Sequence, residues 1–335
     1  MPLTLPRIQS SMLGTRVSHA RSISRIYSQP RFVIPPLVSQ PCRHFSRERF
    51  AGAVSPSIKE KLPDPDLNPF RFSEFDLQGK VFVVTGGGRG LGLTLAEALV
   101  EASGEVYCLD KLLEPEKEFR LVQRRLGPQY GGALHYHQVD VREADNVDRV
   151  ISDIAAHHQR MDGLIAAAGV QYVTPALEYP PDKIMEMLDV NYKGVYCSAV
   201  SCARQMIEYN CSGSILLIAS MSGLVANKGF TSSVYNSSKA AVCQLARSLA
   251  MEWGKAVKGK PIRVNALCPG NIITPMVLKN FADDPKLKEL WERENMLGRL
   301  SQPAEYRGAA LFCLSDASTF MTGSQLIIDG GYTAW

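Results

Sequence analysis

Tyr235 and Lys239 stand four positions apart in the run Tyr-Asn-Ser-Ser-Lys. In a helix, positions i and i+4 share a face, so both side chains can point into one cleft. A phenol ordinarily titrates near pH ~10, too high for easy proton exchange at neutral pH, but a neighbouring ammonium lowers its pKa. The pair therefore predicts a proton-transferring tyrosine. The alternative is two residues on a solvated helix face.

Two other segments can supply polar groups to the same cleft. Ser220 follows a strand predicted over 214–218, and a residue just past a strand end lies at the ligand-facing edge of an open α/β sheet. The run Pro-Gly-Asn-Ile-Ile-Thr at 269–274 follows a strand predicted over 263–267. Its backbone and the Thr274 hydroxyl are suited to holding a carboxamide.

A glycine-rich turn joins a predicted strand at 81–85 to a predicted helix at 91–102. Such a turn lets the backbone approach a pyrophosphate, while the helix N-terminus supplies free N–H groups. A tight β–α turn without a ligand is the alternative. Its place between strand and helix favours a dinucleotide site. The critical glycines are Gly86, Gly90 and Gly92, and Gly88, Arg89 and Leu91 share the loop.

Asp110 ends the second predicted strand, 18 residues after Gly92. An acid there can accept hydrogen bonds from both ribose hydroxyls and repels a 2′-phosphate, so it favours NAD. Arg89 and Lys111 argue for NADP because either can attract that phosphate. A helix cap is the alternative role for Asp110. After the third strand, Asp140 and Val141 are expected to flank the adenine.

Short β-branched runs alternate with helix-length stretches from residue 76 to 335. This alternation predicts an α/β domain with a parallel sheet and helices on both faces. The predicted strands are 81–85, 105–109, 134–138, 163–166, 214–218, 263–267 and 325–328. The predicted helices are 91–102, 115–126, 143–158, 182–209, 235–256 and 303–314.

The first 50 residues differ in composition from the rest. Residues 1–47 hold seven arginines, many serines and no Lys, Asp or Glu. This composition is typical of a mitochondrial transit peptide and predicts a matrix location. A basic leader with no address, on a cytoplasmic protein, is the alternative. Residues 51–75 contain four prolines and are expected to form a linker or surface arm.

Composition excludes several other classes. Of 37 Lys and Arg residues, 30 lie outside residues 1–47, against 33 Asp and Glu. The rest of the chain therefore lacks the basic surplus that is typical of nucleic-acid binders. No apolar run reaches 18 residues, so we expect no membrane span. The eight cysteines form no CxxC pair and stand near no histidine at zinc-ligand spacing. We expect reduced thiols and no metal.

The runs TGGGRGLG, AAAGV, DVN, IASMSG, YNSSK, PGNIIT and MTGSQLIIDGGY keep their order over roughly 75–335. Together they resemble the short-chain dehydrogenase/reductase family. The resemblance implies one Rossmann-type domain with a doubly wound, seven-stranded parallel sheet, assembled as a homotetramer or dimer. It implies the tetrad Asn191, Ser220, Tyr235 and Lys239. Further cofactor contacts would come from Ala168, Gly169, Pro269, Gly270 and Ile272. Most members carry Asn-Asn-Ala-Gly where this chain has alanines at 166 and 167, which bears on stability.

The implied reaction moves a hydride between nicotinamide and an alcohol or ketone carbon. Tyr235 would be the acid/base, Ser220 would donate to the substrate oxygen, and Lys239 would lower the pKa of Tyr235 and hold the ribose. Asn191 would anchor a water that relays protons. Residues 220–223, 296–300 and 331–335 resemble fungal polyol and ketose members, D-arabinitol 2-dehydrogenase among them, which implies oxidation of D-arabinitol to D-ribulose.

Three residues are additional candidates for contact with a sugar: Ser222, Asn227 and Asn271. A rival hypothesis is a ketoreductase of secondary metabolism, with a lipophilic pocket around Met221, Met276 and Trp291. A rival of another class is a non-catalytic dinucleotide-binding protein. The complete set of Ser220, Tyr235 and Lys239 speaks against the latter.

Overall fold

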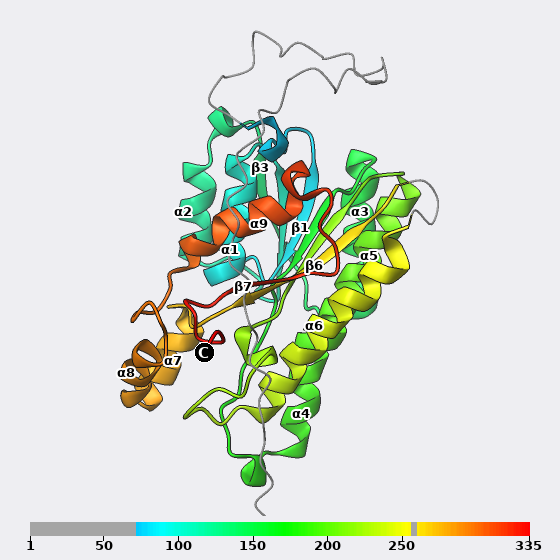
Figure 1. Cartoon of the computed structure of the whole chain (residues 1–335). Helices are drawn as coiled ribbons and strands as arrows, with labels where there is room; N and C mark the ends of the chain where they lie inside the picture. The colour runs from blue at the N-terminus through cyan, green and yellow to red at the C-terminus, as the bar shows by residue number, and fades with distance from the viewer. Residues whose placement is uncertain (1–71, 256–259) are drawn as a thin grey trace, which may run out of the picture. The chain divides into compact units, whose positions relative to one another are not determined.

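The chain alternates strands and helices in the predicted order. The computed structural model describes residues 72–255 and 260–335 (Figure 1). The expected leader, and most of the expected linker, lie outside the described residues. The strands of the described part are β1 Val81–Thr85, β2 Glu105–Asp110, β3 Ala133–Gln138, β4 Gly163–Ala166, β5 Ser214–Ile218, β6 Arg263–Pro269 and β7 Gln325–Ile328.

The helices agree with prediction except at two places. They are α1 Gly90–Glu101, α2 Lys117–Arg125, α3 Ala144–His158, α4 Pro181–Leu188, α5 Val195–Glu208, α6 Ser233–Trp253, α7 Pro275–Asp283, α8 Lys286–Arg293 and α9 Arg307–Leu314. The single helix predicted over 182–209 is interrupted by a π-helical turn, Asp189–Gly194. α7 and α8 were not predicted, although Thr274 and Pro275 form an N-cap and N1 signal.

The strands form one parallel sheet in the order β3-β2-β1-β4-β5-β6-β7. Each neighbouring pair is parallel. This confirms the doubly wound, seven-stranded α/β fold. The chain reverses its direction of winding between β1 and β4, and such a switch point opens a crevice at the carboxyl ends of the strands.

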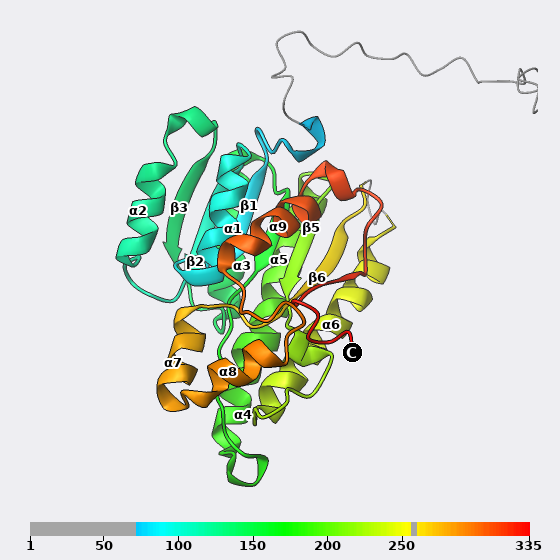
Figure 2. The same ribbon diagram turned by 60° about the vertical axis from the view of Figure 1, so that its left-hand side comes forward.

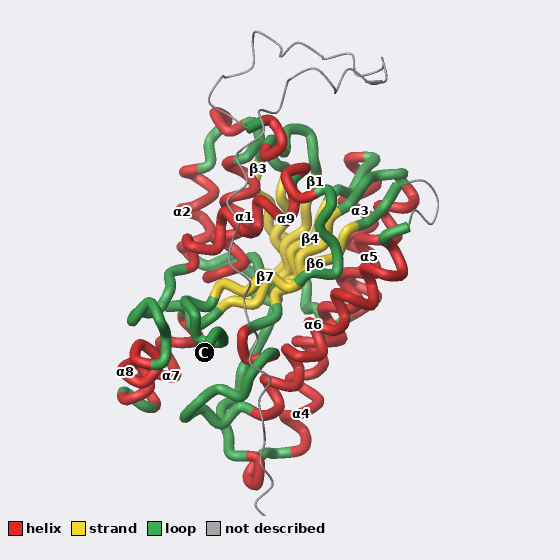
Figure 3. The backbone as a smooth tube through the Cα atoms, viewed as in Figure 1, coloured by secondary structure: helices red, strands yellow, loops and turns green. Residues whose placement is uncertain are grey.

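Helices cover both faces of the sheet (Figures 2 and 3). β1 is buried throughout: Val81 and Val83 pack in a core with α3, α5 and α6, whereas Phe82 and Val84 pack in a core with α1, α2 and α9. Apolar residues on both sides of a strand are what a central parallel strand requires. α7 and α8 lie beyond the sheet, after the carboxyl end of β6 (Figure 2).

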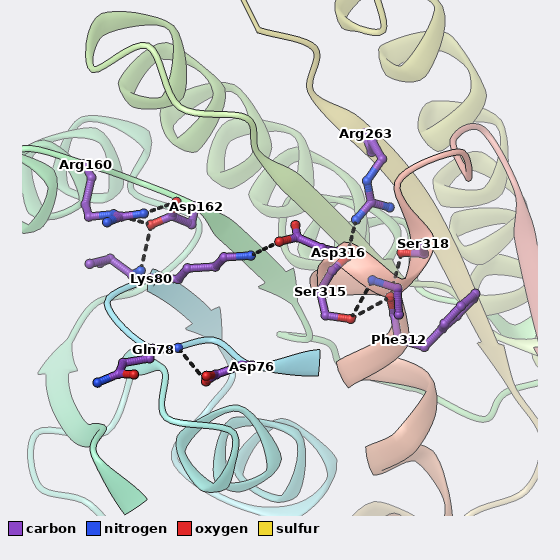
Figure 4. Close-up of polar contacts among 12 residues, drawn as sticks. Asp76, Gln78, Lys80, Arg160, Asp162, Arg263, Phe312, Ser315, Asp316 and Ser318 are labelled. Carbon is purple, nitrogen blue, oxygen red and sulfur yellow. Dashed lines mark hydrogen bonds and ion pairs between the residues drawn. The ribbon is translucent and has the colours of Figure 1, made fainter. Parts of the chain in front are cut away.

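The amino ends of the strands are tied together by charged side chains (Figure 4). Asp162, just before β4, accepts from the backbone N–H of Val81 at 2.8 Å and from Arg160 at 2.7 and 2.8 Å. The Arg263 guanidinium donates to the carbonyl oxygens of Cys313, Ser315 and Met321. These bonds fix the end of α9 to β6. They leave the opposite edge free for a ligand.

In the described part of the chain the cysteines are free. Over the same residues no helix is both long and apolar enough to cross a membrane. No group of three or more His, Cys, Asp or Glu in residues 72–255 and 260–335 could hold a metal ion.

Candidate active site

The glycine loop between β1 and α1 leaves no room for side chains. A Cβ atom on Gly86 would lie 2.7 Å from the Cα atom of Ala168, and Gly86 has a left-handed φ of +66°. A Cβ atom on Gly92 would collide with the carbonyl oxygen of Gly86. The loop therefore turns tightly and places its backbone against the segment that follows β4.

This loop fits a dinucleotide. α1 begins at Gly90, so its free N–H groups lie at the carboxyl edge of the sheet. Leu91 packs on the core that holds α1 in place. Across the switch point, a Cβ atom on Gly169 would meet only the Asn191 Oδ1 and Lys239 Nζ atoms within 4 Å, at 3.5 and 3.6 Å. The glycine loop and Gly169 thus bring backbone without side chains to the two sides of the switch point, where an extended dinucleotide binds in such folds.

Asp110 is bound to the glycine loop. Its Oδ2 accepts from the Gly88 N–H at 3.1 Å, and a Cβ atom on Gly88 would lie 2.8 Å from the same oxygen. Oδ1 accepts a long bond from the Leu112 N–H at 3.5 Å. α2 begins at Lys117, with Glu116 at the N-cap position. The helix-cap alternative for Asp110 is therefore wrong, because its carboxylate orders the turn and the loop instead.

The residues after β3 make contacts that the sequence did not predict. Arg142 donates to the Asp140 carboxylate at 2.5–3.0 Å and lowers the pKa of Asp140. Val141 is buried, and a Cβ atom on Gly194 would lie 2.7 Å from its side chain. Val141 thus supports the π-helical turn. The expectation that Asp140 and Val141 flank the adenine stays a prediction.

Ser220, Tyr235 and Lys239 come together where α6 meets the turn after β5. Tyr235 lies in the first turn of α6, and Lys239 Nζ is 5.8 Å from the centroid of its ring. A Cβ atom on Gly223 would lie 2.6 Å from the Lys239 carbonyl carbon, so the turn that begins at Ser220 packs directly on α6. The Ser220 hydroxyl accepts from the Ser222 N–H at 3.1 Å, which fixes its position.

Burial dominates the titration of this cluster. It raises the pKa of Tyr235, and a hydrogen bond with Ser220 opposes that rise. Burial also lowers the pKa of Lys239 to about 8, and Nζ donates to the Ile218 carbonyl oxygen at 2.8 Å. In the protein alone burial thus opposes the expected lowering of the Tyr235 pKa. That Lys239 lowers this pKa stays a prediction.

Asn191 lies within the π-helical turn, fully buried. Its Nδ2 donates to the Val170 carbonyl oxygen and to Ser238 Oγ, both at 3.0 Å, while its Oδ1 accepts from the Val170 N–H at 2.9 Å. Ser238 in turn donates to the Tyr235 carbonyl oxygen at 2.7 Å. The side chain of Asn191 thus links three elements of the site, and its role in anchoring a water stays a prediction.

The segment after β6 lies across the end of the sheet. A Cβ atom on Gly270 would lie 2.7 Å from the Asp329 Cα atom, so only glycine fits after Pro269. Ile272 pairs with Ser301 as an isolated bridge. The Thr274 hydroxyl accepts from the Val277 N–H at 3.4 Å and so caps α7. Its proton stays available to a ligand, as the carboxamide prediction needs.

Comparison with known proteins decides the family. The family model described as enoyl-(acyl carrier protein) reductase matches residues 86–333. A short-chain dehydrogenase/reductase of Aspergillus versicolor is 39% identical over 285 residues, which cover 84% of this chain and 97% of that protein. The chain belongs to the short-chain dehydrogenase/reductase family. It is therefore an oxidoreductase of that family by descent, and its relatives include polyol dehydrogenases.

Two further similarities within the family bear on ligands. The D-arabinitol 2-dehydrogenase (ribulose-forming) of Scheffersomyces stipitis is 35% identical over 271 residues, 78% of this chain and 96% of that one. A gluconate 5-dehydrogenase from Burkholderia cenocepacia, solved with NADP and tartrate, aligns with a TM-score of 0.69 at 32% identity. The alignment covers 78% of this chain and 98% of that one.

Of the three sugar-contact candidates, two leave polar atoms without a partner. Asn227 Oδ1 and Asn271 Nδ2 are buried and make no hydrogen bond within the described residues. Ser222 is buried in the turn capped by Ser220. Sequence reasoning missed Tyr332, whose hydroxyl accepts from the Lys228 N–H at 2.9 Å and so fixes the loop that carries Asn227.

We call α7 and α8 together the lid. The lid packs around a small core of its own, the lid core: Phe230, Ile273, Val277, Phe281, Leu287, Leu290, Trp291 and Leu300. Trp291 contacts Phe230 and Phe281 with ring centroids 5.3 and 5.4 Å apart. Trp291 therefore packs within the lid, whereas Met221 is buried and Met276 is exposed. The lipophilic pocket expected from these three residues stays a prediction.

Proposed function

We propose that this protein is a polyol dehydrogenase that interconverts a secondary alcohol of a polyol and the matching ketose, of the D-arabinitol to D-ribulose type, with NAD. The observation that carries the reaction is the placement of Ser220 and Tyr235 around Lys239, whose Nζ atom lies next to Gly169 in the segment after β4. Similarity to D-arabinitol 2-dehydrogenase supports the substrate class.

The chain's own residues supply proton transfer and orientation. Tyr235 takes the hydroxyl proton in oxidation and returns it in reduction. Ser220 donates a hydrogen bond to the substrate oxygen, where negative charge develops. Lys239, in its ammonium form, favours the Tyr235 phenolate and can donate to ribose hydroxyls with the protons that Ile218 does not use. The nicotinamide cofactor, when bound, accepts or gives the hydride.

The choice of NAD is supported by Asp110. Its carboxylate stands at the end of β2 and is held by the Gly88 N–H, at the position where an acid meets the ribose hydroxyls of NAD and repels the 2′-phosphate of NADP. The similar gluconate 5-dehydrogenase was solved with NADP. NADP therefore remains the alternative to test.

A hydroxylated substrate is supported by the unpaired amide atoms. Buried Asn227 Oδ1 and Asn271 Nδ2 offer one acceptor and one donor, and a buried polar atom costs about 1–3 kcal/mol unless a ligand or water satisfies it. Both belong to segments that adjoin Ser220 or follow β6. A polyol, with a hydroxyl on each carbon, suits such groups better than a lipophilic ketone does.

The test is a screen of the purified full chain with C5 and C6 polyols, with lipophilic alcohols, and with NAD and NADP separately. We expect oxidation of a polyol with NAD and a loss of about 10³-fold or more in Tyr235→Phe, which removes the acid/base group. Turnover of lipophilic alcohols alone would contradict the polyol dehydrogenase and support the alternative ketoreductase. Nucleotide binding without any turnover would leave the non-catalytic binding protein.

We also propose that residues 1–50 direct the protein to the mitochondrial matrix and that it assembles as a homotetramer or dimer. The leader's arginine and serine content supports the first, and the resemblance to its family supports the second. A reporter fused to residues 1–50 should enter mitochondria, and a diffuse cytosolic signal would refute the targeting. Sedimentation of the full chain gives the assembly, and a monomer would refute it.

A further inference from the structure

Three carboxylates gather at the carboxyl end of β2. Tyr136 on β3 donates its hydroxyl to the Leu112 carbonyl oxygen at 2.6 Å, which folds residues 111–116 back over the strand. Burial, together with the charges of Asp110, Glu114 and Glu116 among its neighbours, raises the pKa of Tyr136 to about 12. The edge that would receive the adenosine ribose therefore carries acidic side chains besides Asp110, of which Glu114 is paired with Arg120 at 2.6 Å.

Arg89, which could counter this charge from the glycine loop, is already paired. Its Nη1 lies 2.9 Å from Glu116 Oε1, and the two side chains are 50% and 41% exposed. Lys111, the second basic candidate, is exposed. Of the two groups that argued for a 2′-phosphate, it is therefore Arg89 that faces a carboxylate of this chain.

Glu116 is placed to hold Arg89 because its side chain is not used by its own helix. It occupies the N-cap position of α2, yet its carboxylate makes no cap hydrogen bond. Glu118 already supplies an acidic group to the first turn. A change at Glu116 should therefore leave α2 intact, which makes the residue open to a clean test.

We propose that Glu116 is a specificity-determining residue that disfavours NADP by occupying Arg89. To serve a 2′-phosphate, Arg89 must leave Glu116, and the freed carboxylate then faces a phosphate of like charge. NAD, with a neutral ribose hydroxyl, leaves the pair intact. Asp110 repels the phosphate directly, whereas Glu116 acts indirectly, because it pairs with Arg89, the group that could otherwise bind the 2′-phosphate. This inference rests on the proposed nucleotide site.

The test measures equilibrium binding of NADH and NADPH to the full chain by nucleotide fluorescence, with no turnover needed. In Glu116→Gln we expect the Kd for NADPH to fall about fivefold and the Kd for NADH to change less than twofold, since an exposed pair is worth up to ~1 kcal/mol. Adding Arg89→Gln should abolish the gain. Glu118→Gln, an equal change of charge on the same helix, is the control and should leave the ratio unchanged.

Three results would overturn the inference while leaving the proposed function standing. The first is an unchanged ratio of the two Kd values in Glu116→Gln. The second is an equal gain in Glu118→Gln, and the third is a gain that survives Arg89→Gln, since either of these would mean a general charge effect. Failure of the unaltered protein to bind either nucleotide would overturn the nucleotide site itself, and with it both proposals.

Discussion

The side chain of Asn191 makes two hydrogen bonds with the backbone of Val170 and so ties the π-helical turn to the loop after β4. Replacing Asn191 by Ala leaves the half-buried N–H and C=O groups of Val170 without these partners. We expect a loss of about 3 kcal/mol in unfolding free energy. Activity should fall as well, because Ser238 and the first turn of α6 lose their support. Urea unfolding and steady-state kinetics measure the two effects.

Ser238→Ala is the matched control for Asn191. It removes one partner of Asn191 and the bond to the Tyr235 carbonyl oxygen but leaves Val170 satisfied. Its cost should be about 1 kcal/mol. Equal destabilisation by the two variants would contradict the importance of the link between Asn191 and Val170.

Lys239 should make stability depend on pH. Its pKa in the folded protein is about 8, against an ordinary 10.5. Between these values the unfolded chain binds the proton and the folded protein does not, so stability rises with pH across that window. From pH 7 to 9.5 the unaltered protein should gain about 2 kcal/mol relative to Lys239→Met, from 1.36 kcal/mol per pH unit above pH 8.

Chemical denaturation at the two pH values measures this difference, and Lys288→Met, which changes an exposed lysine on α8, is the control. The unfolding free energy of Lys288→Met should differ from that of the unaltered protein by the same amount at both pH values. If Lys239→Met and the unaltered protein respond to pH in parallel, Lys239 has an ordinary pKa in the fold.

The sequence predicted what depends on local pattern. Strand periodicity located all seven strands of the described part, and the spacing of Tyr235 and Lys239 located the catalytic helix. It could not predict contacts between distant segments. The bonds from Asn191 to Val170 cross 21 positions, and the pair of Arg89 with Glu116 crosses 27. An asparagine can bond any nearby backbone group and an arginine can pair with any nearby acid, so the residue type does not identify the partner.

The extent to which each side chain is buried could not be predicted from the sequence either. The i, i+4 spacing correctly put Tyr235 and Lys239 on one face, but the direction of the Tyr235 pKa depends on how much water the folded chain excludes. The packing of Trp291 could not be predicted either. Its apolar ring suggested a substrate pocket, whereas the structure places it against Phe230 and Phe281.

Arg263 should matter for stability and not for catalysis. It donates three hydrogen bonds to carbonyl oxygens at the amino end of the sheet, away from the candidate site (Figure 4). Arg263→Met should lower the unfolding free energy by about 3 kcal/mol, because carbonyls lose charged donors. kcat/KM below the melting temperature should stay within twofold of the unaltered value.

For Arg263 the comparison variant is Arg149→Gln, which removes an exposed i, i+4 partner of Asp153 and should cost under about 0.5 kcal/mol. A selective loss of kcat/KM in Arg263→Met, with unchanged stability, would show that this network reaches the site.

The lid helix α7 is fastened to the loop after β4 by one hydrogen bond: Asn280 Nδ2 donates to Gln171 Oε1 at 3.0 Å. Gln171 directly follows Val170, so the bond joins the lid to the loop that Asn191 supports. Gln171→Ala should make opening of the lid easier by about 1 kcal/mol, roughly a fivefold change in the population of open molecules. Hydrogen–deuterium exchange over residues 275–293 should accelerate by that factor, while α3 stays unchanged.

Gln244→Ala, which removes an exposed amide from α6 that pairs with Arg247, should leave lid exchange as it was. Unchanged exchange in Gln171→Ala would mean that the lid core alone, with Trp291 at its centre, holds the lid closed.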